Sequence, residues 1–185
     1  MSGGPTLETP RLILRPTRAE DLDGYVALMS DQEHVRFIGG AAPASTVWRQ
    51  MMTVAGCWSL QGFGFFSVIE KDSGRWVGRL GPWFPEGWPA AEVGWSLLPE
   101  TTGKGYATEG AAAAMDWAFY TLDWPDIIHV IDPDNVGSQK VASRLGSINR
   151  GPTKLPAPFD AVTVDAWGQS RDDWRQNRKR FDWLG

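Results

Sequence analysis

The chain has 185 residues, of which 42% are hydrophobic, so one domain can bury a core without disulfides or a structural metal. Its 18 Lys and Arg residues and 22 Asp and Glu residues give a formal charge of −4, which argues against a nucleic-acid binder. Cys57 is the single cysteine, so one chain offers neither a disulfide framework nor a multi-cysteine metal site, and a reducing cytoplasm is the expected location.

No segment predicts processing or membrane insertion. Residues 1–6 carry no basic region and no apolar run, and no stretch offers the roughly 20 apolar residues that span a bilayer. The basic residues of 175–180 stand beside Asp172, Asp173 and Asp182, which is typical of a solvated helix face. We therefore expect a soluble, unprocessed single domain over residues 1–185.

The first half of the chain predicts a strand, two helices and a β-hairpin. The predicted ranges are 11–15 for the strand, 17–30 and 45–54 for the helices, and 63–70 and 75–81 for the hairpin strands. Thr17 and Glu20 have the spacing of a capping box, and Ser45 is the expected N-cap of the second helix.

The second half alternates strands and helices. The predicted strands are 91–98, 126–131 and 161–167, and the predicted helices are 105–121, 135–145 and one opened by Ser170 with Asp173. Apolar residues of the long helix recur at helical spacing and predict its inner face: Ala111, Ala114, Met115 and Ala118. This order predicts an α/β (α+β) domain with one central sheet.

The glycines of residues 103–105 lie between a predicted strand and a predicted helix. Backbone N–H groups and the positive end of the helix dipole meet there, and glycine lets the backbone approach an anion closely. Lys104 is followed by Gly105, which excludes a P-loop, and Thr108 replaces the third glycine of a dinucleotide fingerprint. The alternatives are a phosphate-binding loop and an ordinary glycine-bearing connection.

The run from Gly103 to Glu109 resembles the pyrophosphate loop of the RimJ/RimL-like branch of the GNAT superfamily of N-acetyltransferases. Thr102 departs from the Gln or Arg that usually begins this loop, whereas Gly105 and Ala107 match it. Three other segments resemble the same branch in the same order: residues 9–15, 92–95 and 135–146. The resemblance implies a single GNAT-like domain over residues 1–185, with its core over about 9–175. Its mixed central sheet of about seven strands is expected to be splayed between the fourth and fifth strands and flanked by helices.

The resemblance further implies acetyl-CoA as co-substrate, with no metal. It places the cofactor along the end of the strand before the loop, along the loop itself and at the start of a later helix. The expected cofactor-binding residues are Ser96, Leu97, Leu98, Gly103, Lys104, Gly105, Tyr106, Ala107, Thr108 and Asn135. The implied reaction is direct attack of a neutral amine on the thioester, with the oxyanion held by a main-chain N–H near Leu97.

Two residues are the candidate catalytic groups. Glu92 shares a strand face with Gly94 and Ser96, so it is a candidate base acting directly or through water, or else a charge partner of the substrate amine or of a basic side chain. By resemblance, Ser138 is the candidate proton donor to the departing thiolate, although some superfamily members use a tyrosine. The structural alternative makes Asn135 a helix N-cap and Ser138 a solvated residue of the first turn.

The acceptor is expected to be a protein N-terminus, an amino acid or a small amine, with no nucleic-acid or membrane partner; a homodimer is left open. Its pocket is expected to be shaped by residues 31–43 and 80–89, and the candidate substrate-binding residues are His34, Arg36, Trp83, Trp88 and Trp95. His129 is expected to be packed or solvated. The competing functions are a non-catalytic acyl-CoA-binding or sensing domain and a nucleotide- or phosphate-binding module.

Overall fold

The computed structural model describes residues 3–184, which form one eight-stranded sheet flanked by helices. The strands follow the spatial order β1-β2-β3-β4-β5-β6-β8-β7. Their bounds are β1 Leu7–Glu8, β2 Leu12–Pro16, β3 Phe66–Glu70, β4 Trp76–Trp83, β5 Glu92–Leu97, β6 Asp126–Ile131, β7 Ile148–Thr153 and β8 Val164–Ser170. The helices are α1 Leu22–Leu28, α2 Ala44–Leu60, α3 Tyr106–Tyr120, α4 Val136–Leu145 and α5 Arg171–Asn177.

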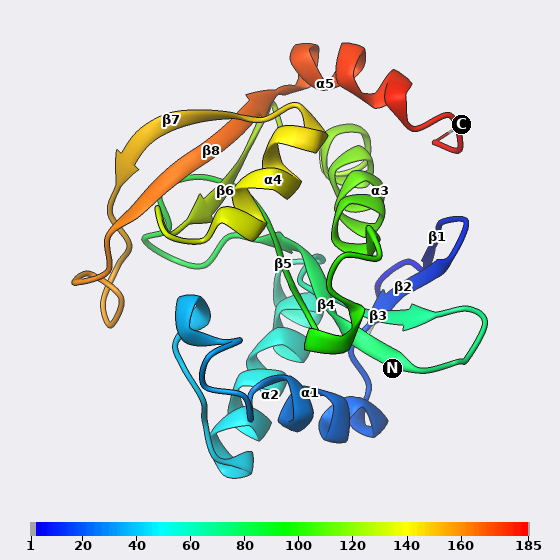
Figure 1. Cartoon of the computed structure of the whole chain (residues 1–185). Helices are drawn as coiled ribbons and strands as arrows, with labels where there is room; N and C mark the ends of the chain where they lie inside the picture. The colour runs from blue at the N-terminus through cyan, green and yellow to red at the C-terminus, as the bar shows by residue number, and fades with distance from the viewer. Residues whose placement is uncertain (1–2, 185) are drawn as a thin grey trace.

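The two helix pairs lie on opposite faces of the sheet, α1 with α2 on one and α3 with α4 on the other (Figure 1). All strand pairs are antiparallel except β5 with β6. The predicted mixed sheet between helices is therefore confirmed. The strand count is eight rather than about seven, and the predicted ranges lack two of the eight: the two-residue β1 at the sheet edge, and β7 beside β8.

The parallel pair β5–β6 is open over most of its length. Within residues 3–184, only Glu92 and Ile128 of this pair are in register, and the two strands part beyond them. In Figure 1, β5 runs toward the start of α3 while β6 leads to α4. This confirms the predicted splay between the fourth and fifth of the strands expected from the sequence.

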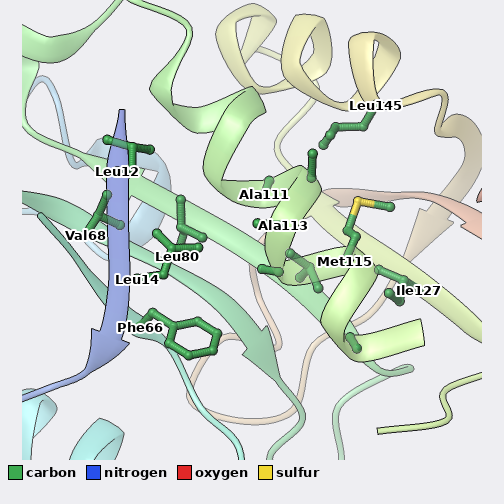
Figure 2. Packing of buried hydrophobic residues seen from close by; sticks show 14 of the residues in the cluster. Leu12, Leu14, Phe66, Val68, Leu80, Ala111, Ala113, Met115, Ile127 and Leu145 are labelled. Atoms are coloured by element: carbon green, nitrogen blue, oxygen red, sulfur yellow. The ribbon is translucent and has the colours of Figure 1, made fainter. Parts of the chain in front are cut away.

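The main core lies between the sheet and α3. Ala111, Ala114, Met115 and Ala118 are all fully buried, so the predicted inner face of this helix is confirmed. Figure 2 shows side chains of α3 directed at Leu80 and at the strands beneath it. A Cβ added to Gly110 would lie 2.5 Å from Leu80 Cδ2, because the helix packs so closely on β4.

Two predicted helix starts are wrong. Thr17 does not cap a helix: its hydroxyl is buried and lies 2.9 Å from Tyr25 Oη, while Asp21 accepts the hydrogen bond from the Arg18 N–H. Asp21 is itself buried against Arg15, at 2.7 Å. Ser45 lies inside α2, whose N-cap position is the extended Pro43. Tertiary packing overrides the local capping pattern at Thr17, whereas α2 simply begins one residue before Ser45.

The late elements match more closely. The helix predicted from Ser170 begins at Arg171, and Ser170 and Asp173 form its capping box. The predicted strand 161–167 is shifted and runs from Val164 to Ser170. None of the helices within residues 3–184 combines the length and apolarity needed to cross a membrane.

Candidate active site

Where β5 and β6 part, side chains pair with the backbone groups that would bond to the neighbouring strand in a continuous sheet. Ile128 N–H donates to the Ala91 carbonyl at 2.9 Å, beside the pair of residues that is in parallel register. Beyond it, Val130 N–H donates to Glu92 Oε1 at 3.2 Å, and His129 Nδ1–H donates to the Val93 carbonyl at 2.6 Å. Backbone groups that would close the sheet are thus paired with side chains, and the gap between the strands is built into the fold.

Glu92 lies at the closed end of this gap. Its carboxylate is buried, and its second oxygen accepts a hydrogen bond from Trp88 Nε1 at 2.6 Å. Burial raises the pKa of Glu92 to about 7, although the hydrogen bonds from Val130 and Trp88 act in the opposite direction. A carboxyl group with this pKa exchanges a proton near neutral pH, as a general base must.

The main chain of β5 turns donors into the gap. Leu98 N–H donates to the Val77 carbonyl on β4 at 2.9 Å. Because bonded directions alternate in an antiparallel pair, the N–H groups of Leu97 and Trp95 point away from β4 and toward the gap. His34 Nε2 lies 2.6 Å from the Leu97 carbonyl, so the turn before α2 reaches the end of the gap.

The glycine turn presents free backbone donors at the start of α3. Gly103 and Gly105 have φ values of +81° and +83°, a region that favours glycine. Gly105 is the N-cap and provides no side-chain acceptor, so within residues 3–184 the N–H groups of residues 106–108 lack an acceptor. The buried Thr108 Oγ1 also has no partner there. These unpaired donors and the positive helix end fit a phosphate group.

The side chains of the loop mostly face elsewhere. Thr102, at the position that departs from the GNAT pattern, is exposed, as is Lys104. Tyr106 is buried and donates its hydroxyl hydrogen to Glu70 Oε1 at 2.6 Å. The turn therefore offers anions its main-chain N–H groups. Because these donors belong to the backbone, Thr102 in place of Gln or Arg does not remove them.

A pocket of about 320 Å³ borders the same helix start. Arg11, Gly105, Thr108, Arg144 and Trp183 are among its lining residues. Arg11 also ties the turn to the sheet: its Nη1 donates to the Lys104 carbonyl at 2.9 Å, and its Nη2 lies 2.6 Å from the Glu109 carboxylate. Glu109 thus neutralises Arg11, so the positive charge beside the unpaired N–H groups comes from Arg144 and from the end of the helix.

The start of α4 lies on the other side of the gap. Asn135 caps the helix, because its Oδ1 accepts a hydrogen bond from Ser138 N–H at 3.1 Å. Ser138 Oγ accepts a hydrogen bond from Trp95 Nε1 at 3.2 Å, which leaves its own proton available. The capping role of Asn135 is confirmed, and its contact with a cofactor stays a prediction.

A family model described as an acetyltransferase (GNAT) domain matches residues 11–148, which include the gap, the glycine turn and α4. The chain belongs to the GNAT family of acetyltransferases. This membership implies acetyl-CoA-dependent acetyl transfer, and the unpaired N–H groups at the start of α3 fit the phosphates of such a cofactor.

Curated and solved GNAT proteins resemble this chain over most of its length. A Bacillus licheniformis protein described as an uncharacterized N-acetyltransferase p20 is 30% identical over 150 residues, covering 79% of this chain and 84% of its own. An acetyltransferase structure from Agrobacterium tumefaciens str. C58 has a TM-score of 0.80 and 29% identity, covering 90% of this chain and 95% of that one. Mycobacterium smegmatis RimJ, solved with CoA-disulfide, shares the fold at a TM-score of 0.77 and 18% identity, covering 98% and 97%.

Aromatic side chains of this GNAT domain line the face of the sheet that carries Glu92. Phe65 and Trp83 stack with ring centroids 5.0 Å apart. A Cβ added to Gly94 would lie 3.2 Å from Glu92 Oε1 and 3.3 Å from Phe65 Cε1, so these two side chains border the same space. Phe65 had no place among the residues expected from the sequence, because nothing in its local pattern separates it from core phenylalanines.

The predicted acceptor residues are dispersed. Trp83 and Trp88 lie on the Glu92 side, but Trp95 points to the opposite face, where it packs on His129 at 4.8 Å. His34 reaches the gap, whereas Arg36 is exposed and paired with Glu33. The substrate roles of these residues stay predictions.

His129 is packed, as expected. It is buried and lies 3.0 Å from Ser147 Oγ through Nε2. Burial lowers the pKa of His129 to about 4, so the ring is neutral at physiological pH. Among residues 3–184 there is no group of three or more His, Cys, Asp and Glu side chains arranged to hold a metal ion.

Proposed function

We propose that this chain is an acetyl-CoA-dependent N-acetyltransferase that moves an acetyl group to a primary amine by direct attack in a ternary complex. The observation that carries the proposal is the gap between β5 and β6, with Glu92 at its closed end and unpaired donors of the glycine turn at its open end. Acetyl-CoA supplies the acetyl group and the thiolate leaving group.

Each proposed chemical role belongs to a group that borders the gap. Glu92, with a pKa near neutrality, takes a proton from the ammonium form of the acceptor, directly or through water. The N–H groups of Trp95 and Leu97 are directed so that one of them can stabilise the oxyanion. Ser138 gives its free proton to the departing thiolate and regains one from the attacking nitrogen, which loses its second proton as the amide forms.

The proposed branch is RimJ/RimL-like, and the proposed acceptors are protein N-termini, amino acids and small amines. Support comes from the uninterrupted run Gly103–Glu109 and from the fold shared with RimJ. A structure described as a putative ribosomal-protein-serine acetyltransferase from Vibrio cholerae has the same fold, with a TM-score of 0.75. Its identity to this chain is 20%, so the likeness supports the fold and leaves the acceptor to experiment.

Release of free thiol tests the proposal directly. The protein is incubated with acetyl-CoA and a panel of amines, amino acids and N-terminal peptides, while calorimetry measures coenzyme A binding separately. We expect binding and acceptor-dependent thiol release. Binding without release for any acceptor would favour a non-catalytic acyl-CoA-binding domain, and no binding at all would exclude both functions.

Replacing Gly105 should weaken cofactor binding. Its φ of +83° disfavours any side chain, and an added Cβ would lie 3.4 Å from Arg11 Nη2 at the edge of the pocket. For Gly105→Val we expect the dissociation constant of coenzyme A to rise about tenfold, since a non-glycine residue in this region costs on the order of 1–2 kcal/mol. Gly3→Val is the control, because a Cβ there meets nothing within 4 Å, and an equal loss in both variants would contradict the assignment.

Removing the Ser138 hydroxyl should slow the chemical step. For Ser138→Ala we expect kcat to fall about 10- to 100-fold with little change in KM, because proton transfer from a positioned group contributes at least this much. Ser143→Ala, on the exposed side of α4, is the matched control. An unchanged kcat in Ser138→Ala would leave the hydroxyl with only its hydrogen bond to Trp95.

A further inference from the structure

Arg79 is a cation of the central sheet that no acidic side chain within residues 3–184 neutralises. It lies on β4, partly buried, with its guanidinium carbon 5.2 Å from the Phe65 ring centroid and 5.8 Å from that of Tyr25. Across the same residues it forms no ion pair, and no oxygen accepts a hydrogen bond from it. Two rings thus contact the guanidinium, while its five N–H donors lack protein acceptors there.

Asp21, whose charge also affects Tyr25, is already hydrogen-bonded to other groups. Asp21 accepts two hydrogen bonds from Arg15, at 2.7 and 2.8 Å, and one from Ser67 at 2.7 Å. It is therefore not available to Arg79. A guanidinium stays charged in proteins, and a cation that is partly removed from water is unfavourable unless an anion pairs with it.

Arg79 shares its face of the sheet with Glu92. Arg79 is in register with Ser96 on β5, and Ser96 is on the same side of that strand as Gly94 and Glu92. The ring of Phe65 lies between Arg79 and Glu92. It contacts the guanidinium of Arg79 and also borders the space beside Gly94 and Glu92. An uncompensated cation and a carboxyl group with a pKa near 7 therefore stand at opposite ends of one aromatic surface.

We propose that Arg79 binds a carboxylate of the acceptor, so that the substrate is an amine that also bears a carboxylate, as an amino acid does. The inference rests on the proposed acetyltransferase function and names its substrate class. Guanidinium and carboxylate match in a two-bond geometry, which gives specificity as well as affinity. Glu92 and Ser96 are four residues apart, roughly 13 Å along a strand. Glu92 Oε1 reaches within 3.2 Å of a Cβ added to Gly94, halfway along this span, and the Arg79 guanidinium carbon lies 5.2 Å from the centroid of Phe65, which borders the same point.

Acceptors that differ only in the carboxylate test the proposal. Thiol release from acetyl-CoA is measured with the L-amino acids and with their carboxamides. We expect kcat/KM for the best amino acid to exceed that of its amide by at least about 30-fold, the scale of a charge-assisted hydrogen-bond pair. Arg79→Met should abolish this ratio and Arg79→Lys should restore part of it. Equal rates for acid and amide, or an unchanged ratio in Arg79→Met, would overturn the proposal.

Two controls separate folding and cofactor effects from acceptor recognition. Arg49→Met makes the same change at a solvent-facing position of α2 and should keep the ratio of the unmodified protein. Arg79→Met should retain its affinity for coenzyme A and its melting temperature within a few degrees, and Arg79→Lys carries the test if the methionine variant does not fold. Peptides with Asp or Asn as the second residue form a further arm, in which a preference for the acidic peptide that Arg79→Met does not lose would count against Arg79.

Failure of the proposed function remains distinguishable from failure of this inference. If no amine releases thiol, the acetyltransferase proposal fails. Binding of amino acids and their amides to the protein with coenzyme A bound then tests the role of Arg79. A rise in melting temperature with an amino acid but not with its amide, absent in Arg79→Met, would then support a carboxylate site. No such rise with any amino acid would overturn it.

Discussion

Glu92→Gln should lower kcat/KM by about 100- to 1,000-fold, because general-base catalysis by a positioned carboxylate contributes on this scale. The glutamine keeps the size of the side chain next to Val130 and Trp88 but cannot take a proton. The unmodified enzyme should gain activity as the pH rises through about 7, the pKa of Glu92, and the variant should lose this step. Rates measured between about pH 5.5 and 9 with one acceptor test both expectations.

Glu8→Gln is the matched control, since Glu8 is exposed on β1 at the edge of the sheet. It should leave both the rate and the pH profile unchanged. A Glu92→Gln variant that keeps the step near pH 7 would remove the base role from Glu92 and leave it as a structural group at the gap.

The same residue should make stability depend on pH. The pKa of Glu92 is raised from 4.5 to about 7, so the folded protein holds this proton more tightly than the unfolded chain does. Its contribution is therefore most favourable below about pH 4.5 and is lost as the pH rises to about 7, a change on the order of 3 kcal/mol. Urea unfolding at several pH values should show this decline, and Glu92→Gln should reduce it.

Gly78→Ala should destabilise the fold by about 1–3 kcal/mol and impair the site, because overpacking of a well-packed sheet costs this much. A Cβ at Gly78 would lie 2.5 Å from the Ser96 carbonyl oxygen and 2.7 Å from Leu97 Cα. Those backbone atoms belong to the part of β5 that borders the gap. We therefore expect weaker coenzyme A binding together with a lower free energy of unfolding.

Gly56→Ala makes the same change where an added Cβ meets nothing within 4 Å. Gly56 lies within α2, so alanine should stabilise the protein by roughly 0.5–1 kcal/mol. Urea unfolding of the two variants gives opposite signs if the contacts of Gly78 govern its effect. A stable Gly78→Ala variant with unchanged coenzyme A affinity would show that β5 moves without cost.

Features that depend on a few neighbouring residues could be predicted from the sequence. Asn135 caps α4 and Ser170 caps α5 because each side chain reaches backbone N–H groups only three residues ahead. Gly103 and Gly105 mark a turn that needs positive φ, and the spacing of small apolar residues marks the buried face of α3. Together with the resemblance to GNAT proteins, these local patterns determined the fold class and the candidate site of the acyl donor.

Only the tertiary structure decided the chemistry beside that site. The pKa of Glu92 depends on burial and on a hydrogen bond from Val130, which is 38 residues away. Thr17 lost its capping role because Tyr25 and Asp21 meet in a buried network, and the uncompensated charge of Arg79 shows only when the acidic groups around it have been placed. Burial and charge pairing depend on contacts between distant segments, and no local pattern in the chain encodes them.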